Sequence, residues 1–137
     1  GPFGTCTGVT VPSIGGGSCA IEGMEGIAFD AGGTLFGALS ARGVSGSPGL
    51  YTINPLTGQA TFVAAILDAS GLPPSGGVVS LQFVNGTLFG GTATPISPAT
   101  DGGRLITIDP ITGRFSFVGT VSATGGSSLG ALAFKVE

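Results

Sequence analysis

The sequence predicts an all-β protein made of repeated units of short antiparallel strands. The first observation is an internal repeat, in which the segment Leu50–Gly58 (LYTINPLTG) returns as Leu105–Gly113 (LITIDPITG). The second is the content of glycine and proline, 28 and 9 of 137 residues, which is typical of short strands joined by turns and disfavours helices. The third is that the apolar residues occur in short runs, the pattern of buried strands.

Each repeated unit contains four predicted strands. In the first unit, which spans 26–67, we expect them at 26–29, 34–40, 50–53 and 60–63. In the second unit, which spans 80–121, we expect them at 80–83, 87–94, 105–108 and 115–118. The last strand of the second unit alternates aromatic and smaller residues, which predicts that its aromatic side chains share one face.

Turn residues separate these strands at equivalent places in the two units. Asn85-Gly86 is the strongest hairpin signal, because both central residues of that turn need a positive φ, and a Gly-Gly pair takes its place at 32–33. The segments 54–58 and 109–113 each combine a proline, which presets φ, with a final glycine that accepts the left-handed conformation. The turns therefore predict the same hairpin order in both units.

The recurring pattern G-x-A-F, G-T-L-F-G and L-x-x-I-[DN]-P-x-T-G resembles the blades of bacterial secreted β-propellers. The resemblance covers Gly26 to Val121 and resumes at Leu129. It implies β-propeller-type blades, about three per chain, in a single domain that spans 1–137. It implies little about function, because propellers carry many unrelated activities.

The third blade is expected to be shortened and split between the two ends of the chain. Residues 129–137 resemble a first strand with no second strand after it, and 1–21 begin like a second strand with no first. The two ends could pair within one chain, pair between one copy and the next, or belong to a longer tandem chain. Closed single-chain propellers typically need at least four blades, so an arc of about three leaves an open sheet edge.

We expect another copy of the chain to complete this edge, head to tail, by β-strand complementation. The predicted partner is therefore the chain itself, and closure by its own two ends is the alternative. The residues predicted to form the assembly strands are Phe3, Gly4, Thr5, Gly130, Ala131, Leu132, Ala133 and Phe134.

The charge pattern argues against two other kinds of partner. Charged residues make up 8% of the chain and its net charge is −3. The basic residues are scattered and offer no face to nucleic acid: Arg42, Arg104, Arg114 and Lys135. No apolar run reaches the roughly 18 residues of a membrane helix, so we expect no membrane insertion. A surface this poor in charge is weakly protected against association, which favours self-assembly.

Cys6 and Cys19 predict a disulfide in the shortened third blade. An even number of cysteines in a chain without histidine suits an oxidising compartment, and a pair of buried free thiols is the alternative. We therefore expect an extracellular or cell-surface location. The chain starts at Gly1 without a signal peptide, so we expect a processed product or a part of a longer chain.

The sequence lacks the residues of the common active sites. Because it has no histidine, it has no Ser-His-Asp triad, no Cys-His pair and no histidine metal site. Its carboxylates fall mostly in predicted turns and offer no converging pair: Glu22, Glu25, Asp30, Asp68, Asp101 and Asp109. Asp30 and Asp101 lie beside glycines and are weak calcium candidates, although capping of their own turns is the favoured interpretation. We expect no enzymatic activity and no cofactor.

These observations predict a non-catalytic extracellular structural protein that assembles into a filament or surface layer. The alternative is a secreted binding module that holds a glycan or a protein ligand in the loops of one propeller face. The loops that differ most between the units are 41–48 and 95–103, and Arg42 and Arg104 lie in or beside them. A fragment of an enzyme that lacks its catalytic blades is a third hypothesis.

Overall fold

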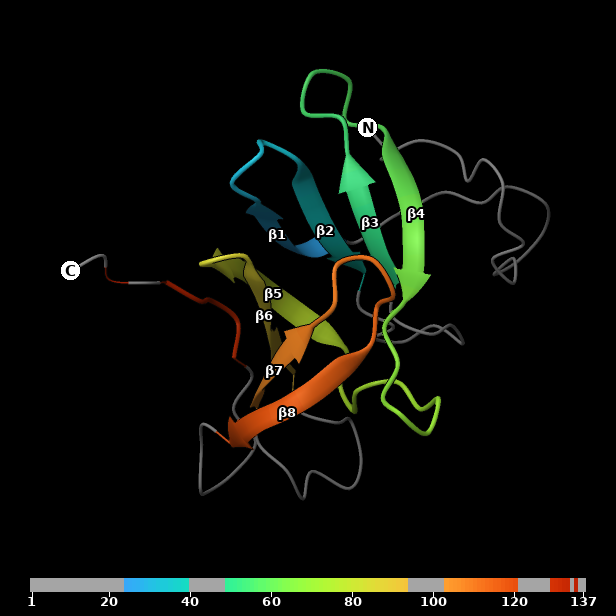
Figure 1. Ribbon diagram of the computed structural model, residues 1–137, viewed down its shortest axis with the longest axis vertical. Helices are drawn as coiled ribbons and strands as arrows, with labels where there is room; N and C mark the ends of the chain where they lie inside the picture. Colours follow the sequence, from blue (N-terminus) through green and yellow to red (C-terminus); the bar gives the residue numbers. More distant parts are fainter. Residues whose placement is uncertain (1–23, 40–48, 94–102, 121–128, 134, 136–137) are drawn as a thin grey trace.

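The chain folds into two antiparallel sheets stacked on each other (Figure 1). A computed structural model describes residues 24–39, 49–93, 103–120, 129–133 and 135, and these contain no helix and therefore none that could cross a membrane. The first sheet consists of β1 (Met24–Phe29), β2 (Leu35–Leu39), β3 (Gly49–Ile53) and β4 (Ala60–Ala65). The second consists of β5 (Val78–Val84), β6 (Thr87–Thr92), β7 (Arg104–Ile108) and β8 (Phe115–Thr120). The all-β prediction is confirmed, with strands within a few residues of their expected positions.

The two sheets have the same topology and the same register. Each is a meander in which strands that follow one another in sequence are hydrogen-bonded neighbours. Gly37 pairs with Ile27 and Tyr51 in the first sheet, and the repeat-equivalent Gly90 pairs with Leu81 and Ile106 in the second. The bulges recur as well: β1 and β5 are each irregular near their start.

The predicted turns adopt the conformations that their residues favour. Asn85 and Gly86 have φ values of 49° and 81°, as the two central residues of a tight hairpin require. Gly58 and Gly113 have φ values of 73° and 70°, in the left-handed region. Each of these glycines donates its N–H to the carbonyl at the start of its turn, at 2.8 Å for Gly58 and 2.9 Å for Gly113.

The two faces of each sheet can be told apart by their side chains. In the first sheet, Phe36, Ala38 and Leu50 point to what we call the trailing face, which packs on the second sheet. Leu35 and Tyr51 point to the opposite, leading face. At the equivalent positions of the second sheet, Leu88 and Ile106 lie in the core between the sheets, so its leading face packs on the first sheet.

The main core therefore joins the trailing face of the first sheet to the leading face of the second. The rings of Phe36 and Phe83 meet across it with their centroids 5.3 Å apart. Its buried members are Ala28, Phe36, Ala38, Leu50, Ile66, Val78, Leu81, Leu88, Ile106, Ile108 and Phe115. Because the trailing face of one sheet packs on the leading face of the equivalent sheet, the two outer faces of the stack are different.

A second, smaller apolar cluster covers part of the leading face of the first sheet. Tyr51, Ile53 and Ala60 are buried there, and Tyr51 packs edge-on against Phe62 with ring centroids 5.5 Å apart. Burial raises the pKa of the Tyr51 phenol. The first sheet is thus apolar on both faces, although only its trailing face meets the second sheet.

The connection between the sheets is tied to the second one. Ile66 is fully buried, and Leu67 forms a parallel bridge with Arg114. The Leu67 N–H donates to the Gly113 carbonyl at 3.3 Å, and the Phe115 N–H donates to the Leu67 carbonyl at 3.0 Å. These bonds attach the end of the first sheet directly to the start of β8.

Candidate functional site

The C-terminal segment, residues 129–133, lies against the trailing face of the second sheet. The Leu129 N–H donates to the Thr92 carbonyl at 3.1 Å. The Ser80 hydroxyl donates to the Leu129 carbonyl at 2.6 Å. A side chain at Gly91 would collide with both the Leu129 carbonyl oxygen and the Ser80 hydroxyl, so glycine at this position makes room for the segment.

Three equivalent stretches of chain meet around one shallow hollow of about 260 Å³. They are Glu25–Ile27 from β1, Val79–Gln82 from β5, and 130–132 from the C-terminal segment. β1 and β5 are the first strands of the two sheets, and the sequence predicts 129–137 as the first strand of a third unit. Figure 1 shows β1, β5 and the C-terminal segment on the same side of the molecule.

The leading face of the first sheet carries two exposed apolar side chains at its β1 edge. Ile27 is 58% exposed and Phe29 is 55% exposed. Their equivalents in the second sheet are covered: Leu81 is 4% exposed, and Phe83 packs against the main core. The sequence does not reveal this difference, because Phe29 and Phe83 occupy the same motif.

The predicted assembly residues are described only in part. Gly130, Ala131 and Ala133 are exposed, and Leu132 is half-buried. As a single chain, residues 129–133 do not form a regular strand. Phe3, Gly4, Thr5 and Phe134 lie outside the described residues, and so do Cys6 and Cys19, so pairing of the two ends and the disulfide stay predictions.

The aspartates that the structure describes accept hydrogen bonds from backbone N–H groups of their own turns. Asp30 Oδ1 accepts the N–H groups of Gly32 and Thr34 at 3.0 and 2.7 Å. Asp68 and Asp109 bind the backbone two to four residues ahead in the same manner. The N–H groups of Thr112 and Ile111 lower the pKa of the Asp109 carboxyl by stabilising its charged form.

Among the described residues, no three histidine, cysteine, aspartate or glutamate side chains gather into a group that could hold a metal ion. Of the two weak calcium candidates, Asp30 uses one carboxylate oxygen for its own turn, and Asp101 lies outside the described residues. Of the carboxylates weighed for acid–base chemistry, Glu25 lies beside the hollow and Glu22 lies outside the described residues.

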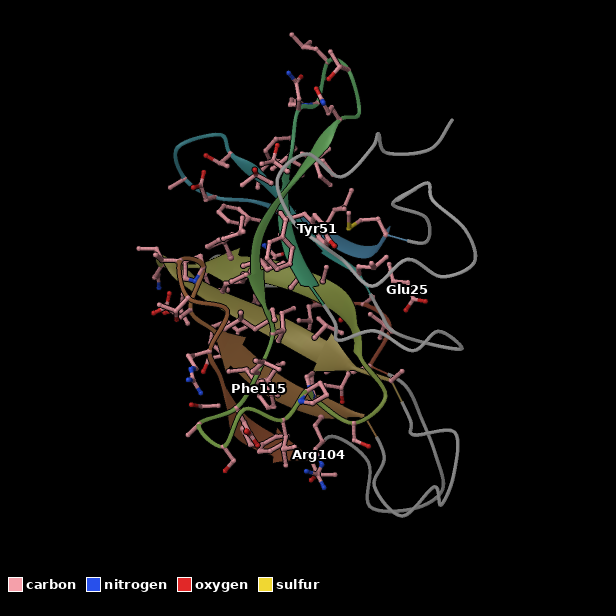
Figure 2. All side chains as sticks on the ribbon, turned by 90° about the vertical axis from the view of Figure 1, so that its right-hand side faces the viewer. Glu25, Tyr51, Arg104 and Phe115 are labelled. Carbon is pink, nitrogen blue, oxygen red and sulfur yellow. The ribbon has the colours of Figure 1, made fainter. Side chains whose placement is uncertain are left out.

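The loops of the alternative hypothesis are largely beyond the described ranges, including Arg42 and residues 41–48. Figure 2 shows Arg104 and Phe115 on the second sheet and Tyr51 on the first. The Arg104 guanidinium lies over the ring of Phe117, 4.8 Å from its centroid, an arrangement typical of a cation–π contact. This contact gives Arg104 a structural role at the start of β7.

The part of the chain that the structure describes defines a class of protein: an all-β fold with two equivalent four-stranded sheets stacked on each other. Comparison of the chain with protein-family models, curated proteins and solved structures found no match.

Proposed function

We propose that the chain is a non-catalytic extracellular structural subunit built from β-propeller-type blades, and that copies join head to tail into a filament or surface layer. In this proposal, 129–137 of one copy supply the first strand of a split third blade. Residues 1–21 of the next copy supply the rest, with Phe3, Gly4 and Thr5 in the neighbouring strand. The only partner required is the chain itself.

The position of the C-terminal segment carries the proposal. Residues 130–132 line the same hollow as the corresponding parts of β1 and β5. The segment also contacts Ser80, and Ser80 in turn lies beside Gly26, its equivalent in β1. This position of the C-terminal segment beside β5 supports the proposal that it supplies the first strand of a third blade.

The backbone of this segment supports strand addition. Among the hydrogen bonds between described residues, the backbone N–H of Leu129 is the one from 129–133 that donates to another backbone group. Each backbone hydrogen bond that an added strand made with this segment would contribute about 0.5–1.5 kcal/mol net. An exposed segment that pairs with an added strand in this way can join one chain to another.

The proposal is tested by measuring molar mass as a function of concentration, using size-exclusion chromatography with light scattering and negative-stain imaging. We expect the unaltered chain to form assemblies that grow with concentration. Gly130→Pro and Ala131→Pro each remove one backbone N–H from an exposed position, and neighbouring N–H groups of a strand point in opposite directions. At least one of the two substitutions should therefore abolish assembly.

Ala131→Ser is the matched control, because it changes the same exposed position and keeps the N–H. It should assemble like the unaltered chain. A chain that stays monomeric at its highest soluble concentration would refute the proposal. Assembly that survives both proline substitutions would refute strand addition at this segment.

A binding function is the second candidate, and one observation favours it. A hollow of about 450 Å³ lies at the turn end of the first sheet and is lined partly by hydroxyl and amide side chains. The polar side chains in its lining are Thr34, Thr52, Asn54, Gln59 and Thr61. Such groups hydrogen-bond sugars, so a glycan array with the unaltered chain and with Gln59→Ala tests this candidate. Binding that Gln59→Ala weakens would support it.

A further inference from the structure

The contact between the two sheets pairs small side chains with large ones along the first strands. On the trailing side of β1, Gly26 and Ala28 are small, and a Cβ at Gly26 would lie 2.8 Å from the carbonyl carbon of Ser80. On the leading side of β5, Leu81 and Phe83 are large and pack in the same core as Ala28. Close approach of the two strands therefore depends on this difference in size.

The same two kinds of surface recur, uncovered, on β1 and on the C-terminal segment. By the repeat, Ala131 and Ala133 occupy the positions of Gly26 and Ala28, and both are exposed. Ile27 and Phe29 occupy the positions of Leu81 and Phe83, and they are 58% and 55% exposed. The C-terminal segment thus offers two small residues, and the leading face of β1 offers two large apolar ones.

The chain brings these two segments to one hollow but does not pack their side chains on each other. Ile27 and Ala131 line the same hollow, yet both stay exposed. A second copy, placed as the second sheet is placed on the first, would cover both. Residues of equal repeat position lie opposite each other in the existing contact, as Gly26 and Ser80 do. If residues of equal repeat position also lie opposite each other between copies, Lys135 of one copy would face Asp30 of the other. These two side chains carry opposite charges.

We infer that Ile27 and Phe29 of one copy pack onto Ala131 and Ala133 of a second copy. This inference rests on the proposed head-to-tail assembly and adds a face-to-face contact to its edge-to-edge strand pairing. The occupant of the exposed leading face is thus the C-terminal segment of another copy. The contact reproduces between chains the packing that β1 and β5 make within one chain.

Two single substitutions and their mixture test the inference. Phe29→Glu removes the large residue, and Ala133→Glu blocks the small one, and each alone should keep the chain monomeric. In an equimolar mixture, the intact Phe29 of one variant meets the intact Ala133 of the other, so a dimer should form and grow no further. Phe29→Ala should weaken association on the order of tenfold, as expected for losing part of one buried aromatic side chain.

Leu56→Glu is the matched control, since Leu56 is 93% exposed at the tip of a turn and takes no part in the contact. It should assemble like the unaltered chain, and thermal melts followed by circular dichroism should be alike for all these exposed-site variants. If Phe29→Glu assembles normally, or if the mixture forms no dimer, this contact is refuted while head-to-tail assembly stands. If the unaltered chain itself never assembles, the proposed function falls and this inference falls with it.

Discussion

Replacing Gly91 with alanine should detach the C-terminal segment from the second sheet. A Cβ at this position would overlap the Leu129 carbonyl oxygen and the Ser80 hydroxyl, and it would lie 2.9 Å from Leu129 Cγ. Overpacking of this kind typically costs about 1–3 kcal/mol. The segment is docked by two hydrogen bonds, which together contribute about 1–3 kcal/mol.

The C-terminal segment, rather than β6, should move, because β6 carries Gly91 and is hydrogen-bonded to a strand on each side. β6 pairs with β5 and with β7, and it also contributes Leu88 to the main core. The free energy of unfolding of the two sheets should therefore change by less than about 1 kcal/mol. Amide exchange at Leu129 should accelerate on the order of tenfold, because about 1.4 kcal/mol of lost docking corresponds to that factor.

Hydrogen exchange measured by NMR, together with urea denaturation, checks this prediction. Gly119→Ala is the matched control: Gly119 lies in β8, and a Cβ there would meet no atom within 4 Å. The prediction is wrong if Leu129 exchanges at the same rate in the Gly91→Ala variant as in the unaltered chain. It is equally wrong if Gly119→Ala releases the segment to the same extent.

Three further predictions concern the sheets and their turns. Leu50→Ala should lower the free energy of unfolding by about 2–5 kcal/mol, since Leu50 is fully buried in the main core, and an unchanged denaturation midpoint would contradict that packing. Asn85→Val should destabilise the β5–β6 hairpin by roughly 1–3 kcal/mol, because a β-branched residue is strained at a φ of 49°, and thermal denaturation measures this loss. The pKa of the Asp109 carboxyl is lowered in the folded chain, so its contribution to stability is present above the unfolded pKa and is lost as the pH falls through the folded one. Asp109→Asn should flatten that part of the stability–pH curve, as measured by urea denaturation at a series of acidic pH values.

The repeat predicts the strands and turns well because both are local properties. The equivalence of Leu50–Gly58 and Leu105–Gly113 fixes two strand–turn segments at once, and Asn85-Gly86 specifies its hairpin by φ alone. The parallel bridge between Leu67 and Arg114 was not predicted, because it depends on how the connection crosses to the second sheet. No local pattern carries that information.

Burial at equivalent positions was not predictable for a related reason. Phe29 and Phe83 share a motif, yet one lies at the end of the stack and the other lies inside it. The site did leave one signal in the sequence: the second unit has Gly91 where the first has Ala38. The structure explains this difference, because the C-terminal segment lies against Gly91.

The direction of the stack determines which kind of assembly these surfaces favour. Two leading faces brought together by a two-fold axis would set Ile27 and Phe29 against the same large side chains, with no small residues to receive them. A leading face placed on the C-terminal segment of another copy matches large to small, as the contact between β1 and β5 already does. The contact is therefore heterologous, and it produces a ring if the rotation from copy to copy closes and a filament if it does not. The two proposed contacts place the same C-terminal segment at the junction, with its edge bound to one strand and its small face covered by another.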